Sequence, residues 1–516
     1  MAQRLENISL GSPGFYGLNT QSSPVELPPQ FCTVAENCII DQYGRLGARK
    51  GFNTQTDGIT GLGGEKVKRV FEGAVAGTHT LFAVGNNKIF RIDTTSTTND
   101  TLTELTLPGG YTISDDNWDF IDFNGEVYFV QDGQDILMGT STSLGSDALV
   151  TADSESSESV PDAPQVNCIA AAYGRLWGCG SSAAPSTVYW SDTLIGDGWT
   201  EGASGSINLT TVWPNGYDEA QAIAFHNGRL IIFGKNSILI YAGADDPSTM
   251  SLEDFIIGTG CIARDSVQNT GSDIIFLSPT GLRLLSRTII ESSLPLGEIT
   301  SNVRRDVIHA TLNESIGINS VYSQEEGFYL LIYEGQSQIY CVDFKQALDE
   351  GVRRITSWSG SLFNCACRAV DGTLYVGGSP GIGTYSGYQD DGESYRYQYS
   401  SPSLTFGKPA SLKFPKKIRP IIIGGSGFVA TVSWSFGYND AANTQTLVLE
   451  SGGALAEYNI SEYNIAEFST AIGVSDEAIN ANGSGTEVKL GISADINGSG
   501  FSLQQINIQA LIGRLI

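Results

Sequence analysis

Residues 377–381 read Gly-Gly-Ser-Pro-Gly and satisfy the G-x-S-x-G pattern that surrounds the nucleophilic serine of many hydrolases. In that pattern the residue after the serine donates its backbone N–H to the oxyanion of the intermediate. Pro380 occupies this position and has no N–H to donate. The stretch also does not sit at the strand-to-helix elbow that such a serine needs. We therefore expect no hydrolase site at Ser379.

Other residue types that could perform chemistry are scattered along the chain. The three histidines, His79, His226 and His309, are far apart, and none belongs to an HExxH motif. The eight cysteines form no CxxC pair, which argues against a zinc site and a disulfide framework. The acidic string 390–393 lacks the spacing of a calcium loop, and no phosphate-binding loop is present. The sequence predicts a protein that is not an enzyme, with no catalytic, cofactor-binding or metal-binding residues.

Aromatic residues leave one route to carbohydrate chemistry open. The segment 189–199 resembles the Asp-box of sialidase propellers, but its spacing is different. Trp190, Trp199 and Trp213 could form a surface on which sugars stack, although such aromatic residues more often pack between the blades of a propeller. No pair of carboxylates stands out for glycoside hydrolysis, yet Asp and Glu are too common to exclude such a pair.

The chain is strongly acidic. Its 516 residues include 29 Lys and Arg against 56 Asp and Glu, for a formal net charge of −27. A surface of this sign repels phosphate groups and disfavours tight binding of nucleic acid, while the passage of DNA along a negative wall is compatible with it. No signal peptide or bilayer-spanning apolar run is expected, and the scattered cysteines fit a protein assembled in a reducing cytosol.

The elements that would position any functional residue come from one repeated unit, a β-hairpin with glycine in its turn. Seven copies surround Gly77, Gly125, Gly174, Gly228, Gly281, Gly327 and Gly372. Many copies precede a second hairpin, so each interval of about 50 residues holds four short strands, the content of one propeller blade. We therefore predict an all-β fold with a β-propeller of about seven blades over residues 61–395, with six or eight blades also open. Arg175 and Arg229, which follow two of the turn glycines, are then structural residues.

The regular repeat ends near residue 395. Residues 396–516 continue with turns and alternating strands, which predicts a compact antiparallel β-sandwich domain. Residues 300–312 are the best helix candidate, and the Ser-rich, acidic segment 143–164 is an expected loop insertion. Five basic residues gather against the acidic average and are expected at a domain or subunit contact, with DNA contact as the alternative: Lys408, Lys413, Lys416, Lys417 and Arg419.

The N-terminal stretch 14–52 carries the most specific pattern of the chain. It contains Gly-Leu-Asn-Thr, Leu-Pro, Ala-Glu-Asn, Gly-Arg-Leu and Arg-Lys-Gly at 17–20, 27–28, 35–37, 44–46 and 49–51. We call these five strings the N-terminal signature. The stretch resembles the opening of the tail nozzle, or tubular tail-tube, proteins of short-tailed bacteriophages. The C-terminal residues 501–516 are similar to the last strand of the same family.

The resemblance implies a structural virion protein located in the viral tail and assembled in the host cytoplasm. Six copies are expected to form a ring below the portal and adaptor, enclosing a channel that retains DNA and conducts it during ejection. Expected partners are further copies of the chain, the tail adaptor ring, portal-associated proteins and tail fibres, while genomic DNA passes without sequence-specific binding. Residues 1–60 would form an N-terminal arm and ring-contact segment, in which Arg45 and Arg49 are further candidate subunit contacts. The alternative is a propeller-type tail depolymerase or lectin that binds bacterial surface glycans.

Overall fold

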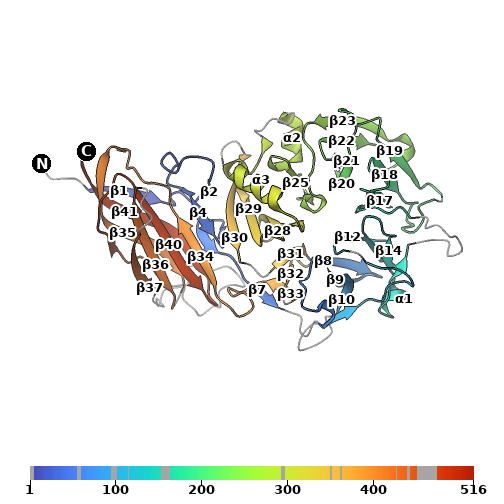
Figure 1. Cartoon of the computed structure of the whole chain (residues 1–516), viewed down its shortest axis with the longest axis horizontal. Helices are drawn as coiled ribbons and strands as arrows, with labels where there is room; N and C mark the ends of the chain where they lie inside the picture. Colours follow the sequence, from blue (N-terminus) through green and yellow to red (C-terminus); the bar gives the residue numbers. More distant parts are fainter. Residues whose placement is uncertain are drawn as a thin grey trace.

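A β-propeller and a β-sandwich lie side by side along the long axis of the molecule (Figure 1), which confirms the predicted all-β class. The computed structural model describes residues 5–54, 60–93, 101–113, 115–152, 163–200, 202–291, 297–348, 351–360, 363–379, 381–425, 427–437, 442–449 and 474–515. Within these ranges no helix is long and apolar enough to span a bilayer. The expected insertion at 143–164 contains the end of helix α1 (Ser141–Leu144) and strand β15 (Val150–Thr151), while residues 153–162 lie outside the described ranges.

The propeller is built from the predicted hairpins. At the turn Tyr173–Gly174 both residues have positive φ, 53° and 68°, which is the geometry of the tight turn that matches the twist of two antiparallel strands. Four blades follow in sequence: β8 (Arg69–Val75), β9 (Thr78–Gly85), β10 (Lys88–Asp93) and β11 (Thr101–Glu104) form blade 1; β12 (Asp119–Phe123), β13 (Glu126–Val130), β14 (Leu137–Gly139) and β15 (Val150–Thr151) form blade 2; β16 (Cys168–Ala172), β17 (Arg175–Cys179), β18 (Thr187–Trp190) and β19 (Gly205–Asn208) form blade 3; β20 (Ala220–His226), β21 (Arg229–Gly234), β22 (Ser237–Ala242) and β23 (Ser251–Ile257) form blade 4.

The repeat around Gly281 does not complete a blade. It forms a sheet of three strands, which we call the short sheet: β24 (Gln268–Asn269), β25 (Ile274–Ser278) and β26 (Gly281–Leu284). Helix α2 (Leu285–Glu291) begins directly after β26, so a single bridge between Arg283 and Glu298 occupies the place of a fourth strand. The helix predicted at 300–312 is confirmed as a 3-10 turn, Ser301–Val303, followed by α3 (Arg304–Asn313).

Two further blades bring the number of four-stranded blades to six, so the expected number of about seven is corrected to six blades and one short sheet. Blade 5 is β27 (Ile318–Ser323), β28 (Phe328–Tyr333), β29 (Gln338–Ala347) and β30 (Arg353–Ser359); blade 6 is β31 (Phe363–Arg368), β32 (Leu374–Gly378), β33 (Ile382–Tyr385) and β7 (Phe52–Thr54). The outermost strand of blade 6, β7, comes from the N-terminal end of the chain and pairs with β33. This pairing closes the propeller between blade 6 and blade 1.

The sandwich is made from both ends of the chain. Its first sheet contains β1 (Leu5–Leu10), β5 (Cys38–Ile40), β6 (Leu46–Ala48), β35 (Ser411–Gly424), β38 (Val474–Ser475), β39 (Ile479–Asn480) and β41 (Phe501–Leu515); its second contains β4 (Val34–Glu36), β34 (Tyr395–Ser400), β36 (Val429–Phe436), β37 (Asn443–Val448) and β40 (Val488–Ile496). The short strands β2 (Gly17–Leu18) and β3 (Phe31–Cys32) lie beside β30. The described part of the segment expected to form an N-terminal arm is therefore woven into both domains.

The two domains share one apolar core and one continuous sheet. Strand β4 pairs with β34 of the sandwich and, through Glu36 and Ser357, with β30 of blade 5. A single cluster of buried side chains includes Ile508 of the sandwich, Tyr329 of blade 5 and Leu282 of the short sheet. Burial of apolar surface across the junction holds the propeller and the sandwich as one body.

Candidate functional site

Charged side chains from several blades meet inside the propeller, in a group that we call the axial cluster. Its members are Arg69, Asn117, Asp119, Arg264, Asp265, Asn319 and Glu334. The guanidinium of Arg69 in blade 1 lies 2.6 Å from the carboxylate of Glu334 in blade 5 and 3.0 Å from that of Asp265, next to the short sheet. Blades 1 and 5 are not neighbours in the ring, so these contacts lie across its interior.

Arg264 makes a second set of connections across the same interior. Its guanidinium pairs with Asp265 at 2.6 Å and donates to Asn117 and to the carbonyl oxygen of Trp118, both ahead of blade 2. It also donates to Asn167, which precedes blade 3. These contacts come from residues near the starts of the innermost strands, so the cluster links blades 1, 2, 3 and 5 and the short sheet across one end of the propeller.

Opposite charges offset the effect of burial at Asp265 and Arg69, whereas burial raises the pKa of Asp119 above its usual value. Burial would raise the pKa of Asp265, but the positive charges of Arg264 and Arg69 hold it below its usual value. Burial likewise acts to lower the pKa of Arg69, and the carboxylates of Asp265 and Glu334 raise it above its usual value. Each guanidinium pairs with at least one carboxylate of the cluster, so the cluster joins blades, while the Nε of Arg69 is buried without a hydrogen-bond partner among the described residues.

Sequence reasoning missed this cluster. Arg264 and Asp265 lie in an ordinary string, Ala-Arg-Asp-Ser, and their partners are up to about 200 residues away along the chain. The only signal was a pair of opposite charges between two apolar runs, a place where burial requires pairing.

Arg49, one of the expected subunit contacts, is used inside the chain. Its side chain is fully buried and bound by both oxygens of Asp390, at 2.8 and 2.6 Å, while its Nε donates to Asn37 at 3.0 Å. The guanidinium also lies 4.1 Å from the centre of the Tyr395 ring. Arg49 therefore fixes the N-terminal segment to the boundary between blade 6 and the sandwich, and its burial is incompatible with a contact to a second copy.

The remaining expected contact residues divide into two groups. Lys413 is buried, donates to the carbonyl oxygens of Lys408 and Thr486, and has a pKa lowered by burial, so it belongs to the interior of the sandwich. Arg45 is half-buried and pairs with Asp41 at 2.6 Å. Four of the basic residues are exposed on or beside β35: Lys408, Lys416, Lys417 and Arg419. Lys408 pairs with Glu6 and Arg419 with Asp476, whereas Lys416 and Lys417 form no ion pair with any described residue.

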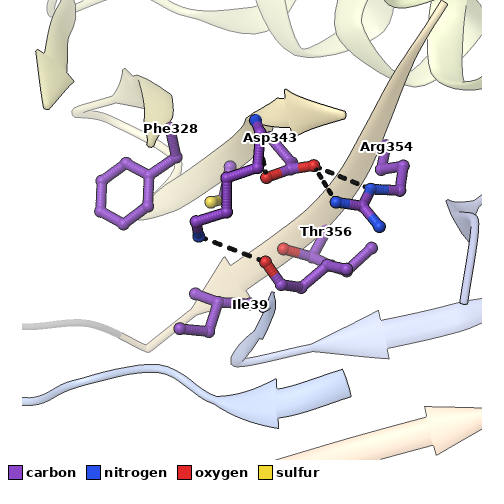
Figure 2. A pocket seen from close by; sticks show the side chains of 8 residues that line it. Ile39, Phe328, Asp343, Arg354 and Thr356 are labelled. Atoms are coloured by element: carbon purple, nitrogen blue, oxygen red, sulfur yellow. Dashed lines mark hydrogen bonds and ion pairs between the residues drawn. The ribbon is translucent and has the colours of Figure 1, made fainter. Parts of the chain in front are cut away.

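A narrow crevice lies between β5 of the sandwich sheet and the strands of blade 5 (Figure 2). Asp343 and Arg354 face each other in it with an ion pair of 2.6 Å, and Lys345 donates to the carbonyl oxygen of Ile40. The space between these side chains admits no water molecule, so it is a packed junction and not a ligand pocket. A second, open groove of about 290 Å³ runs along β1. Apolar side chains such as Leu27 and Phe406 line it together with the polar side chains of Asn7, Ser403 and Thr405, and Glu6 is its one carboxylate.

The remaining tryptophan and arginine candidates from the sequence are buried in blades or bonded to neighbouring residues of the same blade. Trp190, Trp199 and Trp213 are all buried in blade cores, which removes the surface on which sugars could have stacked. Arg175 donates to the carbonyl oxygens of Ser191 and Ala203 within blade 3, and Arg229 pairs with Glu253 within blade 4. Ser379 directly follows β32, while Pro380 lies outside the described ranges.

Among the residues that the structure describes, no three His, Cys, Asp or Glu side chains are arranged to hold a metal ion. The arrangement as a whole consists of ion pairs and hydrogen bonds that join strands, blades and domains. These interactions hold one part of the chain in position against another.

No protein-family model and no curated protein matches the chain. Among solved structures, the WD40 domain of Pan2 from Neurospora crassa is 7% identical, with 66% of this chain and 98% of that domain covered and a TM-score of 0.39. An extracellular domain of the putative hybrid two-component system BT4673 from B. thetaiotaomicron is 11% identical, with 86% and 61% covered and a TM-score of 0.41.

PorZ, a surface component of the type-IX secretion system of Porphyromonas gingivalis, is 12% identical and has a TM-score of 0.35. The match covers 66% of this chain and 42% of the PorZ chain, so this chain corresponds to less than half of that protein. Similarities at this level do not extend to function, and the fold rests on the strand pairing described above.

Proposed function

We propose that the chain is a structural subunit of a bacteriophage tail, the nozzle ring below the portal and adaptor through which DNA leaves the particle. The observation that supports the proposal most is the structural role of the N-terminal signature, whose residues hold the N-terminal segment against both domains. The signature is the most specific part of the resemblance to the nozzle family, and Gly17, Asn37 and Arg49 in it contact blade 5, the sandwich and the segment between blade 6 and the sandwich. A signature of this kind suits a protein whose function depends on a rigid shape.

Three glycines of the signature occupy sites without room for a side chain. A Cβ atom on Gly17 would lie 2.4 Å from the carbonyl oxygen of Ile355, and one on Gly51 would lie 1.8 Å from that of Gln389. Gly44 lies against Gly14, with a distance of 3.0 Å from its Cβ position to the Gly14 Cα. Close approach of two backbones is a structural requirement that only glycine meets.

Polar residues of the signature also attach the N-terminal segment to its surroundings, in their case through hydrogen bonds. Asn19 accepts hydrogen bonds from the backbone of Gln21 and Ser22, and its amide donates to Asn302 beside α3. Asn37 has a positive φ of 55° and donates to the carbonyl oxygen of Arg396 in β34. Together with Arg49, these residues hold the N-terminal segment between the two domains.

The distribution of charge supports a channel between copies. Residues 61–395 contain 17 Lys and Arg against 42 Asp and Glu, a net charge of −25, whereas residues 396–516 contain 8 against 9. Because the axial cluster crosses the propeller, DNA would pass along the outer surfaces of several propellers arranged in a ring. An acidic wall repels the duplex and does not retain it by adhesion.

Electron microscopy of the purified full-length chain, alone and with adaptor and portal, tests this proposal. We expect rings with sixfold symmetry attached to the adaptor. The same preparation should be incubated with host surface polysaccharide, because the alternative function is a propeller-type depolymerase or lectin. A monomer or trimer that binds or cleaves the polysaccharide would contradict the nozzle.

A further inference from the structure

Two surfaces far apart on the molecule have complementary chemistry. The first, which we call the polar face, is the outer side of strands β35, β41 and β1. The strand register places Arg419, Asn507 and Ser9 in one cross-strand row and Lys417, Gln509 and Asn7 in the next. A third row contains Phe414, Leu511 and Leu5, of which Leu5 is 51% exposed.

The polar face is basic at one side and free of carboxylates in these three rows. Residues opposite one another on neighbouring strands project from the same side of a sheet, so each row is continuous. Ser9 donates to Asn507 at 2.5 Å, and Gln505 donates to Asn507 at 2.8 Å, which fixes the amide side chains in place. Lys417 lies on β35 at one side of the face, and the exposed Lys416 is the extra residue beside it where the register shifts. Neither lysine has a carboxylate partner among the described residues.

The second surface is the outer edge of blade 4, formed by β23. Leu252, Phe255 and Ile257 on this strand are 39%, 47% and 41% exposed, and Glu253 and Asp254 lie exposed among them. β23 is the last strand of its sheet, and among the strands that the structure describes it pairs with β22 alone. An edge strand with three exposed large apolar side chains is an unusual surface for a protein that stays alone in solution.

The backbone of β23 is irregular in a way that favours contact through side chains. Its register with β22 shifts between Ile240 and Tyr241, so Glu253 is an extra residue on β23. Such a bulge twists an edge strand and discourages the addition of another strand. Glu253 is held by Arg229, whereas the Asp254 carboxylate accepts only the backbone N–H of Phe255 among the described residues.

We propose that the polar face of one copy binds the blade 4 edge of the next copy. The contact would set Lys416 and Lys417 against Asp254 and the Phe414 row against Phe255, so both charge and apolar surface are matched. The two surfaces are different and lie apart on the molecule, with β35 and β41 in the sandwich and β23 at the rim of the propeller (Figure 1). A contact between two different surfaces is head-to-tail, and repeating it produces a closed ring when the rotation permits. This inference rests on the proposed nozzle function, for which it supplies the subunit contact.

Charge reversal on each surface provides the test. Lys417→Glu and Asp254→Lys each place like charges across the contact, a change that weakens a protein interface strongly. We expect each variant alone to weaken self-association of the full-length chain by at least about tenfold, measured by sedimentation velocity over a concentration series. Glu65→Lys and Lys66→Glu, exposed on the propeller away from both surfaces, are the matched controls and should assemble normally.

Mixing the two variants distinguishes this contact from any other. In a mixture, the two substituted positions face each other at one joint, and the native Lys417 and Asp254 face each other at the next. A ring in which the two variants alternate therefore has an ion pair at every subunit interface. We expect the equimolar mixture to assemble although neither variant does, and only into rings with an even number of copies. A wild-type ring that survives both reversals, or a mixture that stays dissociated, would overturn the proposed contact while leaving the nozzle function standing.

The other possible occupant of the polar face is nucleic acid. Fluorescence anisotropy with a labelled DNA duplex, on wild type and Lys417→Glu, separates the two. If Lys417→Glu abolishes duplex binding and leaves assembly unchanged, the polar face is a DNA contact and the proposal is wrong. If the wild-type chain forms no ring at all, the nozzle function itself fails.

Discussion

At the scale of single residues, several ion pairs of this chain are removed from solvent. A pair of this kind adds little net stability when both partners are present, but removing one partner leaves a buried charge without compensation. Arg49 and Asp390 at the domain junction, and the axial cluster in the propeller, both have this character.

Arg49→Met is expected to destabilise the chain strongly, because it leaves the Asp390 carboxylate buried without its cation. Breaking such a pair costs roughly 3–5 kcal/mol. Denaturant unfolding followed by tryptophan fluorescence measures the loss. Arg45→Met is the control, because the Arg45–Asp41 pair joins residues four apart on a partly exposed loop and should contribute about 1 kcal/mol or less. Equal effects of the two substitutions would contradict the assigned role of Arg49.

The pH dependence of stability should report Asp265. Its pKa is lower in the folded chain than in the unfolded chain, so the ionised carboxylate stabilises the fold above its unfolded pKa. That contribution is lost as the pH falls through the folded pKa. We expect Asp265→Asn to be less stable than wild type at neutral pH, with a difference that shrinks in acid. Unfolding at a series of pH values, with the exposed Asp245→Asn as control, checks this, and a difference independent of pH would refute it.

At the scale of elements, the turns and strands of the propeller follow from local sequence, whereas its closure does not. The Asn-Gly pair at 227–228 predicts a tight hairpin turn, and both residues have positive φ as such a turn requires. The repeat at Gly77 forms a complete blade. The copy at Gly281 looked equivalent but lacks a fourth strand, because the residues after Leu284 form a helix. The pairing of β7 with β33 joins residues more than 300 apart, and no local pattern predicts it.

A substitution at Gly51 tests the closure of the propeller by β7, because Gly51 lies directly before that strand. Gly51→Ala places a Cβ against the backbone of Gln389, which has no flexible end to move aside. Overpacking of this kind typically costs about 1–3 kcal/mol, and we expect the upper end of that range with earlier thermal unfolding. Gly109→Ala is the matched control because a Cβ there meets nothing within 4 Å and the backbone φ is ordinary. A similar melting temperature for both variants would show that the Gly51 contact is relaxed in solution.

At the scale of the whole molecule, charge and shape carry the functional argument. The all-β class, the propeller and the sandwich could be predicted from turn spacing and alternation. The axial cluster and the burial of Arg49 could not, because both depend on contacts between residues distant in sequence. The polar face was visible only as a basic run, and strand register was needed to separate the buried Lys413 from the exposed Lys416 and Lys417.

The central claim is that copies of this chain form a ring. Native mass spectrometry of the purified full-length chain at low and moderate salt tests it most directly. We expect a particle with six times the 55.0 kDa mass of the chain, which dissociates as salt screens the contact. A single 55.0 kDa species at every concentration and salt would contradict it.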